Sequence, residues 1–152
     1  MKLSDKAIRE IAGSIDCGFI CYVNPETGEM EEFMENNEYE EDLLVTEIDD
    51  ETPEWQKEEI AEIKARNERI DSWNYVIIRQ PNSNESFRFM EDFVEEVIPE
   101  KEQKIYWKAL SWKRPFANFK DLIDDSEYRE AWFRFKEQKL MEYVKSELGM
   151  EE

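Results

Sequence analysis

The stretch CGFICYVNPETGEMEEFM, residues 17–34, decides the fold class of this 152-residue chain. Its first part is rich in β-branched and aromatic residues, which favour strands. Asn24 and Pro25 then open a turn, and Gly28 supplies a backbone position that tolerates a positive φ angle. Apolar residues return directly after the turn, in MEEFM. The pattern predicts a β-hairpin over residues 17–34.

One further strand is predicted in the middle of the chain. The run WNYVIIR, residues 73–79, is the clearest strand signal. The earlier segment 43–48 is ambiguous, because its apolar residues suit a short strand while acidic residues crowd both sides. About three strands without regular alternation with helices indicate the α+β class. We expect a small antiparallel sheet, covered by helices on one face, and a helical C-terminal half.

Two helices are predicted in the first half of the chain. Ser4 is expected to cap the first helix. Thr52 is expected to cap the second, with Pro53 at its first helical position and its end near Ile70. Apolar residues at spacings of three and four mark the inward faces: Ile8, Ile11, Ala12 and Ile15 in the first helix, and Trp55, Ile60, Ile63 and Ile70 in the second.

Four more helices are predicted in the second half. One runs from about Asn84 to Ile98, and Pro99 and Pro115 each begin another. Ser126 is expected to cap the last, which Gly149 ends. Each of these helices has side chains that are expected to face the core. Helix by helix in chain order, they are Phe87, Met90, Phe93, Val94 and Val97; Ile105, Trp107 and Leu110; Phe116, Phe119, Leu122 and Ile123; and Trp132, Phe135, Tyr143, Val144 and Leu148.

Length and composition predict a single domain, residues 1–152. There is no flexible linker and no apolar segment long enough to cross a membrane, and the charged N-terminus does not resemble a signal peptide. A cytoplasmic location is expected. Placed on one extended strand, Cys17 and Cys21 would have Cα atoms about 13 Å apart. This is too far for a disulfide, so both are expected to be small buried hydrophobes.

The net charge of −19 is unevenly distributed. Residues 1–100 contain 9 Lys and Arg against 28 Asp and Glu, whereas residues 101–152 contain 11 of each class. An acidic field of this kind disfavours nucleic acids and anionic membranes, and it favours solubility or basic partners. Plain solubility is the preferred interpretation.

The absence of histidine excludes several kinds of catalytic site. It removes Ser-His-Asp and Cys-His nucleophile systems and histidine general bases, and two cysteines alone cannot complete a zinc site. The four isolated glycines match neither the GxGxxG nor the GxxxxGK[ST] phosphate-binding loop. We therefore expect no metal, no cofactor and no catalytic set, although an enzyme that uses Asp, Glu, Lys or Tyr stays open.

Acidic residues are too abundant to identify a site by themselves. The run around Glu47, Asp49, Asp50 and Glu51 lacks the spacing of a 12-residue calcium loop. Solvated surface is the preferred interpretation of most of these acids. DNA mimicry, in which carboxylates along one surface occupy a nucleic-acid-binding protein, is an alternative.

A segment that mixes cations with aromatic residues is the main candidate for binding. In SWKRPFANFKDLIDD, residues 111–125, three cations stand among three rings. Stacking rings and cations are typical of nucleic-acid surfaces, and a protein partner is also compatible with them. The structural alternative is favoured: helical spacing would turn several rings inward, and the cations would pair with acids or lie along rings. The candidate binding residues are Trp107, Trp112, Lys113, Arg114, Lys120 and Arg134.

The C-terminal sequence resembles the UPF0158 family of uncharacterised bacterial proteins. ALSWKRPFANFKDLID, residues 109–124, and YREAWFRFKEQKLMEYVKSEL, residues 128–148, carry the resemblance. GFICYVNPETGE, residues 18–29, and YVIIRQPNSNESFRFMEDFVEEV, residues 75–97, are also similar. Members often have small residues, commonly Gly-x-Gly-Ala, where this chain has Lys113-Arg114-Pro115. The resemblance implies no activity.

These observations favour a small acidic cytoplasmic protein that acts as a non-enzymatic protein-binding or regulatory module. Its partner would be an unknown protein, with no membrane contact. The alternative is a nucleic-acid-linked role, through the basic-aromatic segment or through acidic DNA mimicry. The oligomeric state stays open.

Overall fold

A computed structural model describes residues 3–35 and 38–150. The chain divides into two compact units: Met1–Gln80 with Val144–Glu152, and Pro81–Tyr143. The single domain over residues 1–152 stays a prediction. No helix within the described ranges is long and apolar enough to span a membrane.

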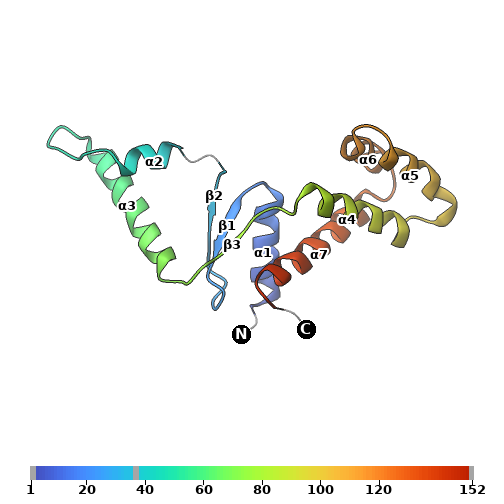
Figure 1. Ribbon diagram of the computed structural model, residues 1–152, viewed down its shortest axis with the longest axis horizontal. Helices are drawn as coiled ribbons and strands as arrows, with labels where there is room; N and C mark the ends of the chain where they lie inside the picture. Colours follow the sequence, from blue (N-terminus) through green and yellow to red (C-terminus); the bar gives the residue numbers. More distant parts are fainter. Residues whose placement is uncertain (1–2, 36–37, 151–152) are drawn as a thin grey trace. The chain divides into compact units, whose positions relative to one another are not determined.

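The first unit holds a three-stranded antiparallel sheet, which confirms the α+β class and the predicted hairpin. Its strands are β1 (Ile20–Val23), β2 (Met30–Phe33) and β3 (Val76–Ile78), in the order β2-β1-β3 (Figure 1). In the hairpin, Ile20 lies opposite Phe33 and Val23 opposite Met30. β3 is shorter than the predicted run 73–79, because Asn74 has a positive φ angle of 53° that interrupts an extended backbone.

Helix α1 (Asp5–Asp16) packs against β1 (Figure 1). Ser4 caps it as predicted, since its side chain accepts a hydrogen bond from the Ala7 amide at 3.1 Å. The predicted stripe is correct throughout: Ile8, Ile11, Ala12 and Ile15 are all buried. Gly28 in the hairpin turn has a φ of +83°, and a Cβ there would lie 3.0 Å from the Ala7 Cβ. The turn therefore approaches α1 at a position that requires glycine.

The two cysteines lie in different environments, and both are free. Cys21 is on β1 and is buried, as predicted. Cys17 is exposed, so its expected burial is wrong. The reason is that α1 extends to Asp16, which makes Cys17 the C-cap of a helix rather than part of a strand.

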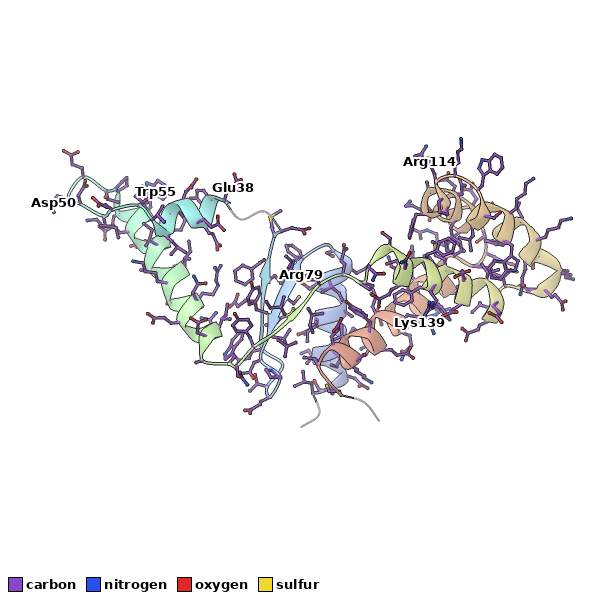
Figure 2. All side chains as sticks on the ribbon, viewed as in Figure 1. Glu38, Asp50, Trp55, Arg79, Arg114 and Lys139 are labelled. Atoms are coloured by element: carbon purple, nitrogen blue, oxygen red, sulfur yellow. The ribbon has the colours of Figure 1, made fainter. Side chains whose placement is uncertain are left out.

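The acidic segment forms a helical hairpin, α2 (Glu38–Leu44) and α3 (Glu54–Asp71), joined by a loop that contains Asp50 (Figure 2). Residues 43–48 therefore do not form a strand. Three acids in the first turn of α2 interact favourably with the helix dipole. The small buried core of the hairpin consists of Leu43, Ile60 and Ile63.

Two details of α3 differ from the prediction. Pro53, rather than Thr52, is the N-cap residue, and the Thr52 hydroxyl bonds within the preceding loop to Asp49. Trp55 was expected to face inward but is 61% exposed, because it lies in the first turn, outside the stripe of Ile60, Ile63 and Ile70 that is buried.

The second unit is helical: α4 (Ser83–Glu96), a 3-10 turn η1 (Glu100–Glu102), α5 (Gln103–Ser111), α6 (Pro115–Asp124) and α7 (Arg129–Glu147), whose final residues from Val144 belong to the first unit. Pro115 begins α6 as predicted. Asn82, rather than Asn84, marks the start of α4, and α5 begins after the 3-10 turn that follows Pro99. The predicted capping of the last helix by Ser126 is wrong: α7 begins at Arg129, and Ser126 lies in the preceding turn, where its hydroxyl accepts a hydrogen bond from the Tyr128 amide.

An aromatic cluster forms the core of this unit. Phe93 contacts three rings edge-on, with its centroid 5.3 Å from those of Trp132 and Phe135 and 6.4 Å from that of Phe119. The Lys139 Nζ lies 5.3 Å from the centroid of the Phe135 ring and 3.6 Å from Asp92 Oδ2. The buried members of the cluster are Met90, Phe93, Val94, Ile98, Tyr106, Leu110, Phe119 and Ile123.

Several predicted core residues of the second unit are exposed instead: Val97, Ile105, Trp107 and Phe116. On α5 the reason is that the core face is occupied by Tyr106 and Leu110, four residues apart, which turns Ile105 and Trp107 outward. On α7 the sequence prediction missed Leu140 and Met141, which are buried.

Candidate protein-docking surface

Helix α5 has two apolar faces, and only one of them is used by the core. Tyr106 and Leu110 are buried in the aromatic cluster. Ile105, Ala109 and Trp112 follow the spacing of four and three along a second face. This second face is open: Ile105 is 56% exposed and Trp112 is 70% exposed.

Helix α6 repeats the arrangement. Phe119 and Ile123 are buried in the core, while Leu122 is half-buried on the neighbouring face. The open faces of α5 and α6 enclose a hollow of ≈ 590 Å³ that we call the α5–α6 groove. Its lining consists of Ile105, Lys108, Ala109, Trp112, Asn118, Asp121, Leu122 and Asp125. A second hollow of ≈ 510 Å³ shares Ile105, Lys108 and Leu122, so the recess continues toward the start of α5.

The turn between α5 and α6 holds the two helices in this arrangement. Arg114 has a φ of 58°, the left-handed conformation that reverses the chain before Pro115 (Figure 2). The Asn118 side-chain amide donates to the Lys113 carbonyl at 2.8 Å and to the Ala109 carbonyl at 3.3 Å. A residue before proline is disfavoured in the right-handed helical region, which explains why helical backbone does not continue through Arg114.

The two sides of the groove differ in charge. On the α5 side, Lys104 and Lys108 line the recess together with Lys101 and Glu102 of the preceding 3-10 turn, so cations outnumber acids there, and the Glu102 carboxylate accepts a hydrogen bond from the Tyr128 hydroxyl. On the α6 side the charged lining residues are Asp121 and Asp125. Residues 103–120 contain five cations and no Asp or Glu. No ion pair joins Lys104, Lys108 or Lys113 to a carboxylate within residues 3–35 and 38–150, which leaves these cations available to a partner.

Lys120 is engaged within its own helix. Its Nζ lies 2.8 Å from Asp124 Oδ2, and the hydrogen bond raises the pKa of Lys120 and lowers that of Asp124. Arg129 lies 3.5 Å from Asp124 and places its guanidinium 4.7 Å from the centroid of Phe133. This exposed network links α6 to the start of α7.

The predicted binding residues do not form one site. Trp112 lines the groove, and Lys113 and Arg114 follow it in the turn. Trp107 is on α5, where its indole N–H donates to Gln103 Oε1 at 3.2 Å. Lys120 is on α6 and Arg134 on α7, and neither contributes to the lining formed by described residues. Their role in binding stays a prediction.

Sequence reasoning missed most of the lining residues. The signal was present: Ile105, Lys108, Ala109 and Trp112 have the spacing of a second helical face, and so have Asn118, Asp121, Leu122 and Asp125. The apolar stripe predicts Ile105 in the core, because such a stripe alone does not show which of two helix faces is buried.

In the first unit, a cluster of ion pairs has a structural role. Arg66 forms a bidentate pair with Glu40 at 2.9 and 2.7 Å and places its guanidinium 4.4 Å from the centroid of Phe33. Arg69 pairs with Glu31. The hydrogen bond that Arg66 donates to the Glu40 carboxylate raises the pKa of Arg66. The pairs connect α3 both to α2 and to β2.

A small polar group lies beside β1. The Ser14 hydroxyl donates to Glu32 Oε2 at 2.5 Å, next to Cys21. Burial raises the pKa of the Cys21 thiol, although the Ser14 hydroxyl partly opposes this. A buried, protonated thiol is a poor nucleophile. Among residues 3–35 and 38–150, no group of three or more Cys, Asp or Glu side chains is arranged to hold a metal ion.

Comparisons with protein-family models, curated proteins and solved structures found no match to this chain.

Proposed function

We propose that this protein is a protein-binding module that docks its partner in the α5–α6 groove. The observation that carries the proposal is the exposure of Trp112 and Ile105 beside a recess with an apolar floor. Tryptophan is enriched at the energetic centres of protein interfaces because it buries a large area with few rotatable bonds. A binding or regulatory role in the cytoplasm and membership of the UPF0158 family belong to the same proposal.

The helix pair is well suited to present this surface. Its inner faces are buried in the aromatic cluster of the second unit, and its connecting turn is held by Asn118. The docking residues therefore project from a rigid support, which limits the ordering entropy that binding has to overcome.

A nucleic-acid role is the alternative, and the acid-free stretch 103–120 supports it. The carboxylates of Asp121 and Asp125 oppose it, because they line the same recess and would repel phosphate groups. Titration of labelled single- and double-stranded DNA and RNA distinguishes the two. Binding that weakens with salt would favour nucleic acid, and no binding at low salt would favour a protein partner.

Site-specific photo-cross-linking tests the proposed function. A photoreactive phenylalanine analogue replaces Trp112, and in a matched variant it replaces Phe133, an exposed ring on α7. We expect a discrete protein adduct at position 112 that is absent at position 133. An excess of wild-type protein, added before irradiation, should prevent the adduct because it competes for the partner. An excess of the Ile105→Asp variant should not prevent it. Identical adducts at both positions, or none at position 112, would contradict the proposal.

A further inference from the structure

We infer that the occupant of the α5–α6 groove is an amphipathic helix with carboxylates along one flank of its apolar stripe and cations along the other. This inference deepens the proposed function and rests on it. It follows from the shape of the recess and from the different charges of its two sides.

The shape fits a helix. The apolar floor, formed by Ile105, Ala109, Trp112 and Leu122, runs along two consecutive helices joined by a short turn. Along α5 it extends from Ile105 to the C-cap residue Trp112, which is about 10 Å along the helix axis, and the adjoining recess lengthens it toward Lys101. An amphipathic helix buries a stripe of this length by lying between two helices.

The charges define the flanks of that helix. Lys104 and Lys108 on the α5 side would meet carboxylates, while Asp121 and Asp125 on the α6 side would meet cations. A nucleic-acid strand carries only negative charge and would satisfy one side alone. A helix with acids on both flanks would likewise satisfy only the cationic side. The opposite charges of the two sides therefore select a helix with acids on one flank and cations on the other.

The split pattern also sets the direction of the bound helix. When the apolar stripe faces the groove, reversing the helix end to end exchanges its two flanks. A helix with its acids on one flank therefore matches the groove in one direction only. Exchanging the acids and cations of that helix should reverse the direction in which it binds.

Three synthetic peptides of 18 residues, each held helical by a side-chain lactam bridge, test the inference. All share one leucine stripe, and their flanks carry Glu and Lys on opposite sides, Glu on both sides, or Lys on both sides. Fluorescence anisotropy gives their affinities for the full chain. Because each exposed ion pair changes affinity by roughly 1.5–5-fold, we expect the split-flank peptide to bind about 5-fold or more tightly than either of the others.

Charge reversal on one side of the groove sharpens the test. In Asp121→Lys/Asp125→Lys both sides are cationic, so the peptide with Glu on both flanks should become the tightest binder. The control Glu130→Lys/Glu142→Lys makes the same change in net charge at exposed positions of α7 outside the groove. It should keep the preference of the wild type for the split-flank peptide.

A spin label on the N-terminus of the peptide reports its direction. Two split-flank peptides are compared, identical except that their Glu and Lys flanks are exchanged. When one of them is bound, the label should broaden the Trp112 indole signal more strongly, and when the other is bound, the Ile105 methyl signals. Equal affinities for all three peptides, unchanged broadening, or no binding at all would overturn the inference. Cross-linking at position 112 would still decide the proposed function separately.

Discussion

The α2–α3 hairpin and the helical second unit contain similar elements but are stabilised differently. The hairpin has a core of three aliphatic residues and relies on ion pairs such as Arg66 with Glu40. The second unit buries an aromatic cluster around Phe93. Residues 38–71 carry 14 acids and 4 cations, whereas residues 103–120 carry 5 cations and no acids. The core of the second unit covers only one face of α5 and one face of α6. The second face of each helix is therefore available for binding.

The largest effect is expected when the aromatic cluster is opened. Phe93→Ala removes a fully buried ring that contacts three others, so it should lower the free energy of unfolding by about 3–5 kcal/mol. Denaturant unfolding followed by near-UV circular dichroism measures the loss. Phe133→Ala, at a ring that is 46% exposed on α7, is the matched control and should cost less than about 1 kcal/mol. Equal losses would contradict the assigned core.

A smaller and local effect is expected in the hairpin. Ile60→Ala opens a core of only three buried residues, whose neighbours are solvated, so the loss should be near the low end for such changes, about 2 kcal/mol. Amide hydrogen exchange should accelerate in α2 and α3. Protection of α4 around Phe93 should not change. Equal acceleration in α4 would show that the two regions do not differ in local stability.

A matched glycine pair tests how α1 meets the hairpin turn. Gly28→Ala should cost on the order of 1–3 kcal/mol, because φ is +83° and the new Cβ would press on Ala7. Gly13→Ala should stabilise by about 0.5–1 kcal/mol, since Gly13 is inside α1 and no atom lies within 4 Å of an added Cβ. Thermal melts of both variants give the two signs. A stability change of the same sign in both variants would contradict the close approach of the hairpin turn to α1.

Thiol chemistry is expected to separate Cys17 from Cys21 without any change in stability. A disulfide reagent should modify one thiol, Cys17, at once at pH 8, because it is exposed. Burial raises the pKa of the Cys21 thiol, so less thiolate is present at a given pH. The rate at which the reagent modifies Cys21 should therefore rise only above the pH range in which ordinary thiols react. Mass spectrometry after timed quenching identifies the modified residue. Rapid modification of Cys21 at pH 8 would contradict its burial.

Sequence reasoning succeeded where one local signal dominated. The stripe from Ile8 to Ile15 and the Pro115 helix start were both correct, because burial of one face and the fixed φ of proline act locally. It left residues 43–48 ambiguous, and the structure shows no strand there: α2 ends at Leu44, stabilised by interaction of its acidic first turn with the helix dipole and by packing on α3. The groove was missed because Ile105 and Tyr106 are adjacent apolar residues, and only the packing of α5 in the unit shows which one is buried.

The most direct test of the central claim is the ¹⁵N-indole spectrum of the full chain during titration with the split-flank peptide. The five tryptophans report on both regions: Trp55 and Trp73 in the first unit, and Trp107, Trp112 and Trp132 in the second. We predict that the Trp112 signal shifts progressively to saturation while the Trp55 signal stays unchanged. A shift of Trp55 with Trp112 unmoved, or no shift at high peptide concentration, would contradict the claim that an amphipathic helix with split flanks docks in the α5–α6 groove.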